Sequence, residues 1–131
     1  MRYVLDTNTC IYALKLQGRV VERMREHGPD EIVITIITLA ELWFGAHKSV
    51  RRAVVRREVD AFLEPFEVLP FDREAADSYS RVRFELERAG RPIGERDLLI
   101  ASISLSRDLT VVTHNVGEFA RVPGLRTEDW H

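Results

Sequence analysis

The sequence predicts an α/β fold, in which helices cover both faces of a parallel β-sheet. Short runs rich in Val and Ile recur along the chain without polar alternation, as strands do when both faces of a parallel sheet are buried. Stretches of helical length separate these runs, so strands and helices alternate. With 131 residues, 45% of them apolar and 31% charged, the chain has the size and balance of one globular domain covering residues 1–131.

The expected strands are four short apolar runs and a weaker fifth candidate near the C-terminus. In chain order they are residues 3–5, 32–36, 67–69, 110–113 and, more weakly, 125–127. Between them the sequence predicts helices at residues 9–15, 19–27, 39–47, 50–62, 73–89 and 96–106. Glycine and proline mark several helix ends, with Gly18 after the first helix and Gly90 and Pro92 after the fifth.

Two of the expected helices differ in character. The helix at 96–106 is apolar nearly all round, which predicts a buried helix. The helix at 50–62 carries apolar side chains on one side and arginines on the other, within the basic run KSVRRAVVRR at 48–57. Such a run is either a solvated helix face or a surface for RNA phosphates or a protein partner.

Composition excludes several classes of protein. A net charge of −2 and a pI near 6.1 give no global basic field that would draw the protein to nucleic acid or anionic membranes. The single cysteine, Cys10, excludes an intramolecular disulfide. Asp6 interrupts what would have to be the apolar core of a signal peptide, and the longest uncharged apolar-rich run, 32–40, is too short to cross a bilayer. We therefore expect a soluble cytoplasmic protein without a membrane partner.

Polar side chains follow the expected strands at the points where the strands end. In an open parallel sheet, ligands bind beyond the carboxyl ends of the strands, so these positions test for a functional site. Four chain segments contribute: Asp6, Thr7 and Asn8; Thr35, Thr38 and Glu41; Glu95 and Asp97; and Thr113, His114 and Asn115. The sequence therefore predicts carboxylates, hydroxyls and amides at one edge of the sheet.

Each acidic residue also has a structural interpretation. Asp6 fits a helix cap as well as it fits a site, and Asp97 can cap or complement the helix that follows it. Glu41 shares a helix face with apolar residues, where a carboxylate is costly to bury unless a cation or hydrogen-bond donors meet it. Three carboxylates at one edge repel one another, and oxygen-only ligands suit Mg²⁺ or Mn²⁺. A cation held in this way supports hydrolysis of a phosphodiester.

Four motifs, which together span nearly the whole chain, resemble the PIN-domain ribonucleases and above all the VapC toxins of toxin–antitoxin pairs. They are YVLDTNTCIYAL at 3–14, ITIITLAELWFGA at 34–46, GRPIGERDLLIAS at 90–102 and LTVVTHNVGEFARVPGLRTEDW at 109–130. The resemblance implies a doubly wound α/β sandwich with about five parallel strands. It also implies an endoribonuclease that depends on Mg²⁺ or Mn²⁺.

The resemblance also assigns roles to individual residues. Asp6, Glu41 and Asp97 match the first three acids of the PIN pattern and are the implied catalytic residues, with Asp6 and Asp97 holding the metal. The fourth acid of the pattern falls on Asn115, and Glu95 is our candidate for supplying the missing charge. The remaining supporting residues that the resemblance implies are Thr7, Asn8 and Thr113.

The implied partners are structured RNA of the tRNA or rRNA class and a small VapB-type antitoxin. The antitoxin is expected to place an Arg against the carboxylates, and the toxin to form a homodimer that contacts DNA only through the antitoxin. The alternative is a catalytically silent PIN-like module that binds RNA or an antitoxin. A phosphatase of the haloacid dehalogenase type fits less well, because Asn8 stands where its second Asp belongs.

Aromatic residues near the expected site leave two interpretations open. His114 is either a proton shuttle or a solvent-facing residue, and the second fits its position better. Trp43 and Phe44, beside Glu41, either stack on bases or pack against the protein. Packing is the commoner role of such residues.

Overall fold

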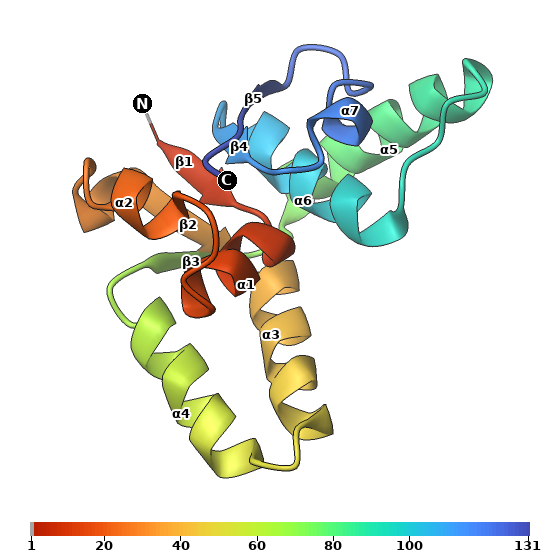
Figure 1. The fold of residues 1–131 in the computed structure, drawn as a ribbon. Helices are drawn as coiled ribbons and strands as arrows, with labels where there is room; N and C mark the ends of the chain where they lie inside the picture. The colour runs from red at the N-terminus through yellow and green to blue at the C-terminus, as the bar shows by residue number, and fades with distance from the viewer. Residues whose placement is uncertain (1) are drawn as a thin grey trace.

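The computed structural model describes residues 2–131 and contains a five-stranded parallel sheet in the order β3-β2-β1-β4-β5 (Figure 1). The strands are β1 (Tyr3–Leu5), β2 (Ile32–Thr35), β3 (Glu67–Leu69), β4 (Thr110–Val112) and β5 (Arg126–Glu128). Each pair of neighbours runs parallel. The predicted α/β class and the parallel five-stranded sheet are therefore confirmed, and β1 lies in the middle of the sheet.

The helices connect the strands and lie on both faces of the sheet (Figure 1). They are α1 (Thr7–Leu14), α2 (Val20–Met24), α3 (Ile36–Lys48), α4 (Arg52–Leu63), α5 (Arg73–Arg88), α6 (Glu95–Ser106) and α7 (Val116–Phe119), with a 3₁₀ turn at Pro29–Glu31. The hairpin of α3 and α4 projects away from the sheet (Figure 1). Among residues 2–131, none of these helices combines the length and the apolar character that crossing a membrane requires.

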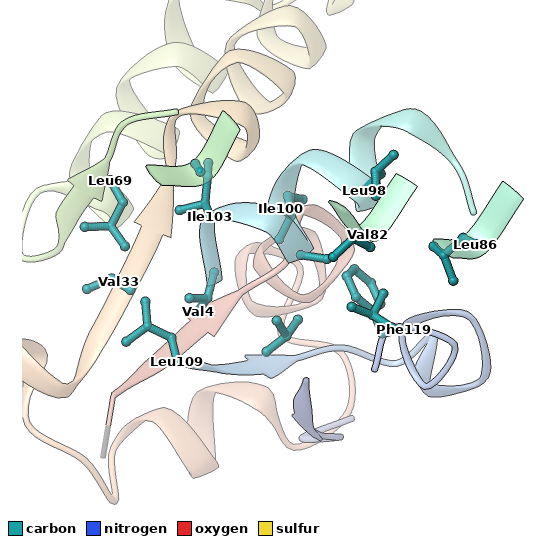
Figure 2. Packing of buried hydrophobic residues seen from close by; sticks show 14 residues of the cluster. Val4, Val33, Leu69, Val82, Leu86, Leu98, Ile100, Ile103, Leu109 and Phe119 are labelled. Atoms are coloured by element: carbon teal, nitrogen blue, oxygen red, sulfur yellow. The ribbon is translucent and has the colours of Figure 1, made fainter. Parts of the chain in front are cut away.

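Alternate residues of the central strand bury two separate cores. Because successive side chains of a strand point to opposite faces, Val4 packs with residues of α5, α6 and α7, whereas Leu5 packs with residues of α1 to α4. Figure 2 shows the first core, in which Ile100 and Ile103 of α6 lie over β1 and β2 and Phe119 of α7 closes one end. As predicted, α6 is largely buried.

Two helices begin two or three residues earlier than the sequence predicts, and in both cases a side-chain cap sets the start. The helix expected at 39–47 begins at Ile36, because Thr35 Oγ1 accepts a hydrogen bond from the N–H of Thr38 at 3.2 Å. The helix expected at 9–15 begins at Thr7, since Asp6 caps it. The β-branched residues at 36 and 37 look like strand in the sequence, but the cap decides their structure.

Other boundaries also differ from the predictions. The helix expected at 19–27 is shorter, Val20–Met24, and the fifth strand lies one residue later than expected. The 3₁₀ turn and α7 were not predicted, because three or four residues are too few to show a helical period. The missed α7 matters most, since it follows β4 at the edge where the polar residues gather.

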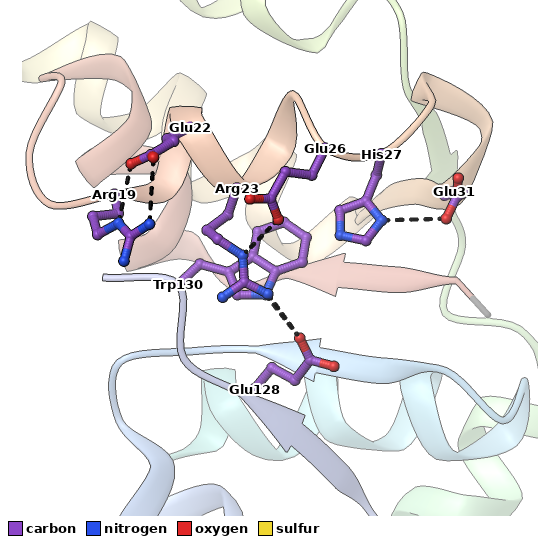
Figure 3. A network of polar contacts seen from close by, with 8 residues as sticks. All are labelled: Arg19, Glu22, Arg23, Glu26, His27, Glu31, Glu128 and Trp130. Atoms are coloured by element: carbon purple, nitrogen blue, oxygen red, sulfur yellow. Dashed lines mark hydrogen bonds and ion pairs between the residues drawn. The ribbon is translucent and has the colours of Figure 1, made fainter.

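The C-terminal segment is fastened to α2 by Trp130, of which only 2% is exposed. Its ring stacks on His27 with 5.1 Å between centroids, and the Arg23 guanidinium lies 5.5 Å from its centre. Its Nε1–H donates to Glu128 at 2.9 Å. Figure 3 shows Arg23 against the Trp130 ring, and the same guanidinium pairs with Glu128 at the end of β5, at 3.7 Å.

Truncation of Phe119 tests whether α7 depends on the first core. Phe119→Ala is expected to cost about 3–5 kcal/mol of unfolding free energy, because it removes a fully buried ring. Urea denaturation followed by circular dichroism measures this cost. Phe84→Ala is the matched control, since Phe84 is 62% exposed and its loss should change the free energy by about 0.5 kcal/mol or less. Equal effects of the two variants would contradict the assignment.

Candidate active site

Asp6 lies at the carboxyl end of the central strand and is almost fully buried. Its N–H donates to the carbonyl of Val112 at the end of β4, at 3.1 Å. Its Oδ1 accepts a hydrogen bond from the N–H of Thr9 at 2.8 Å, so the cap that the sequence allows is present. Since a carboxylate has two oxygens and about four lone pairs, capping still leaves capacity for a second contact.

Buried hydroxyl groups surround Asp6. Thr7 Oγ1 lies 3.1 Å from Thr38 Oγ1, which joins the starts of α1 and α3. Thr113 is fully buried after β4, and its Oγ1 accepts from the N–H of Asn115 at 2.9 Å. Asn8, by contrast, is exposed. The two threonines therefore fix the backbone around the site, and Asn8 lies at its solvent side.

Asp97 comes from the first turn of α6 and is half-buried beside other carboxylates. Its pKa is raised from 3.8 to about 6, first by burial, then by the charge of Glu118 and then by the charge of Asp6. The guanidinium of Arg96 and a hydrogen bond from Asn115 act in the opposite direction on the pKa. The structure thus brings Asp6, Asp97 and Asn115 together, as the sequence predicts.

Glu118 of α7 is a member of this site that sequence reasoning missed. Its carboxylate accepts hydrogen bonds from the N–H of Gly94 at 2.6 Å and from Nδ2 of Asn115 at 2.8 Å. The Gly94 bond is the main cause of the lowered pKa of Glu118, which keeps its negative charge beside Asp97. The only signal in the sequence is its spacing, three residues after Asn115 in NVGEF, which is one helical turn.

Glu95, the candidate for the missing charge, makes a different contact. Its Oε1 accepts from the hydroxyl of Tyr79 at 2.9 Å, and the same hydroxyl accepts from Arg83 at 3.0 Å. Glu95 is thus engaged by α5, and it is not among the groups that shift the pKa of Asp97. In this structure the extra acid beside Asp97 is Glu118.

Glu41 lies in the second turn of α3, and its charge is met by Arg96 of the same chain. Arg96 Nη1 lies 3.3 Å from Glu41 Oε2, and both side chains are about 40% exposed, at 41% and 39%. The carboxylate is therefore not buried in the way that its apolar helix face suggests. Glu41 also lines an open groove of about 370 Å³ between α1, α3 and α4, where Lys15 and Val55 are among the lining residues.

The donor set suits a hard divalent cation. Across residues 2–131, no three Asp, Glu, His or Cys side chains already stand in a metal-binding arrangement. The carboxylates of Asp6, Asp97 and Glu118 are nevertheless close enough to raise the pKa of Asp97, and this repulsion is what a bound cation removes. All the donors are oxygens, so the residues fit Mg²⁺ or Mn²⁺.

Comparison with protein families matches residues 3–125 to the PIN domain. A tRNA(fMet)-specific endonuclease VapC from Salmonella typhimurium is 40% identical over 130 residues, which cover 99% of this chain and 98% of the relative. A ribonuclease VapC2 from Rickettsia felis is 37% identical over 134 residues, with the same coverage of 99% and 98%.

Solved structures show the same likeness. The chain superposes on a chain of DNA-bound VapBC from Salmonella typhimurium with a TM-score of 0.94, at 41% identity, covering 100% of this chain and 99% of that one. A chain of VapBC2 from Rickettsia felis bound to a promoter fragment gives a TM-score of 0.92 at 36% identity, with 100% coverage of both.

The raised pKa of Asp97 predicts that replacing this carboxyl by a neutral side chain increases the stability of the fold, by an amount that depends on pH. Its folded-state pKa of about 6 lies above the ordinary 3.8, so without metal this carboxyl weakens the fold increasingly as pH rises from about 4 to 6. In EDTA, Asp97→Asn should therefore raise the melting temperature at pH 8 by about 3 °C, and the gain should vanish near pH 4. The control is Asp77→Asn, on the exposed face of α5. A gain at pH 4 equal to that at pH 8 would contradict the electrostatic cause.

Proposed function

This chain belongs to the PIN-domain family, as a VapC-type ribonuclease toxin, and from that premise we propose that it is a metal-dependent endoribonuclease of structured RNA. The observation that carries the proposal is the gathering of Asp6, Asp97 and Glu118 where β1 and β4 end. Such a cluster is unstable by itself and becomes favourable around a divalent cation. The tRNA class is supported by the name of the 40% identical relative, a tRNA(fMet)-specific endonuclease.

Three acidic residues carry the proposed chemistry. Asp6 and Asp97 would hold Mg²⁺ or Mn²⁺, and Glu41 would be the third acid of the site and orient the attacking water. When bound, the cation polarises the phosphodiester and lowers the pKa of that water. Because Asp6 is fixed by the cap to Thr9 and by Val112, its carboxylate is already oriented before any ligand arrives.

The supporting residues orient these acids. Thr7 and Thr113 hold the segments at the ends of β1 and β4, while Asn8 is exposed at the solvent side from which a substrate would approach. Asn115 donates to Glu118 and to Asp97, so it organises the carboxylates without adding charge. We assign the fourth acid to Glu118, and Glu95 to a structural contact with Tyr79.

The same premise extends to partners and location. We propose that the protein acts in the cytoplasm as one domain and forms a homodimer. Solved relatives are VapBC complexes bound to DNA, which supports a VapB-type antitoxin as the partner and DNA contact through that antitoxin. The groove that Glu41 lines offers the antitoxin a site where its Arg can replace Arg96 against the carboxylate.

The second candidate function is a silent PIN-like module that binds RNA or an antitoxin. Two observations favour it: Asn115 stands where the pattern has an acid, and Arg96 already neutralises Glu41. Cleavage by the purified protein, freed of any partner, separates the two functions.

Cleavage of total cellular tRNA with Mg²⁺ or Mn²⁺ tests the assignment. Asp6→Asn and Asp97→Asn should each slow cleavage by about 100-fold or more, since several kcal/mol of charge stabilisation is lost. Glu118→Gln should slow it by about 10- to 100-fold, as loss of a residue supporting a metal site does. Glu95→Gln is the matched control and should change the rate little.

Three results would overturn parts of this proposal. Full activity of Asp6→Asn and Asp97→Asn would remove the metal site from this edge of the sheet. A larger loss in Glu95→Gln than in Glu118→Gln would return the fourth acid to Glu95. No cleavage by the unchanged protein with either metal would favour the silent module.

Removal of Arg96 should strengthen metal binding. Arg96 competes with a cation for Glu41 and lies beside Asp97, and exposed ion pairs of this kind contribute about 0.2–1 kcal/mol. Arg96→Gln should therefore tighten Mn²⁺ binding by about twofold to fivefold, measured by isothermal titration calorimetry. The control is Arg81→Gln on the exposed face of α5. Weaker Mn²⁺ binding in Arg96→Gln would show that the arginine orients Glu41 instead of competing for it.

A further inference from the structure

Three aromatic rings from distant parts of the chain form a cluster at the edge of the candidate site. The rings of His114 and His131 stack, with 4.3 Å between centroids and 24° between planes. Tyr12 of α1 packs edge-on against both, at 5.9 Å from His114 and 4.4 Å from His131. We propose that this ring cluster binds an unpaired base of the RNA substrate. This inference rests on the proposed ribonuclease function.

The position of the ring cluster follows from the elements that carry it. His114 stands between Thr113 and Asn115, two supporting residues of the candidate site. Tyr12 lies one helical turn after Asn8 on α1, so the two share a helix face. The cluster thus adjoins the segment after β4 that supplies Thr113 and Asn115 to the candidate site, and we infer that a base held there belongs to a nucleotide near the one that is cleaved.

The ring cluster is held firmly although it faces solvent. His114 Nδ1 lies 2.9 Å from Asp129 Oδ2, and Asp129 Oδ1 accepts from the N–H of His131 at 2.9 Å. The carbonyl of His131 accepts a hydrogen bond from the N–H of Arg19 at 3.0 Å. The residue before His131 is Trp130, which is buried and so anchors this part of the chain. The rings are therefore ordered before a ligand binds, which lowers the entropic cost of binding.

Gly18 makes the close approach of His131 possible. Its φ of +66° is unfavourable for other residues, and a Cβ at this position would lie 2.7 Å from the carbonyl oxygen of His131. The α1–α2 connection is thus shaped to admit His131 against Tyr12.

Exposure and chemistry favour a base over a protein segment. The side chain of His114 is 49% exposed and His131 is exposed, so solvent reaches both imidazoles although they stack on each other. Sequence-specific RNA recognition targets unstacked bases, which stack on aromatic rings including His. The Asp129 carboxylate behind the rings opposes a phosphate, whereas an uncharged base is not repelled. Stacking contributes about 1–3 kcal/mol per base.

The test measures RNA affinity apart from cleavage. In the Asp97→Asn background with EDTA, fluorescence anisotropy follows binding of a labelled single-stranded RNA oligomer and of the same oligomer with abasic positions. His114→Ala should weaken binding of the normal oligomer by about fivefold or more, as the loss of one stacked base does. Its binding of the abasic oligomer should stay unchanged, and His114→Phe should restore the stacking.

Control variants separate a ring effect from a folding effect. His47→Ala, at an exposed histidine of α3 outside the cluster, should leave both oligomers unaffected. Gly18→Ala displaces His131 and should reproduce the defect of His114→Ala while His114 remains. A thermal melt of each variant confirms that it is folded.

The outcomes distinguish this inference from the proposed function. Unchanged affinity of His114→Ala and Gly18→Ala for the normal oligomer would overturn the ring cluster as a base site, even if the unchanged protein cleaves RNA. An equal loss for normal and abasic oligomers would also overturn it, since the rings would then contact the backbone. Loss of binding to a co-purified antitoxin alone, with RNA affinity intact, would assign the cluster to that partner. Base-dependent binding in this assay, together with no cleavage by the unchanged protein in Mg²⁺ or Mn²⁺, would refute the ribonuclease function and leave the base site standing.

Discussion

The hydrogen bond from the N–H of Asp6 to the carbonyl of Val112 is the contact on which the site depends. At 3.1 Å, it continues the parallel pairing of β1 with β4 by one residue beyond the end of β1. Asp6 is thereby held where β4 ends, and the segment after β4 is brought beside it. Because β1 is the central strand, buried on both faces, Asp6 cannot move away from the carboxylates that the other segments supply.

Electrostatic repulsion is concentrated at this edge and is only partly relieved by the protein itself. Asn115 and the N–H of Gly94 hold Glu118, Arg96 pairs with Glu41, and Asp97 is left with a pKa of about 6. The fold tolerates this arrangement because each acid is fixed by a different element. A site that is strained by its own charges and composed of oxygen donors is suited to a divalent cation, which links the packing of the sheet to the proposed chemistry.

The sheet and part of the candidate site could be predicted from the sequence, because both rest on local patterns. The apolar runs predict the parallel sheet, and Asp6 and Asp97 follow from their places after a strand and in the first turn of a buried helix. Glu118 and the Glu41–Arg96 pair were not accessible, since they depend on long-range contacts and on a helix of four residues that shows no periodicity. The start of α3 was misjudged because a side-chain cap outweighed two β-branched residues. The ring cluster joins residues 12, 114 and 131 and depends entirely on the tertiary fold.

The most direct test of the central claim is the position of Mn²⁺ in crystals of the full chain, located by anomalous scattering. We expect one strong peak within direct ligand distance of the carboxylates of Asp6 and Asp97, with Glu118 and Asn115 beside it, and no such peak in Asp97→Asn crystals. A peak elsewhere, or the same peak in the Asp97→Asn variant, would contradict the view that these carboxylates are gathered to hold a cation.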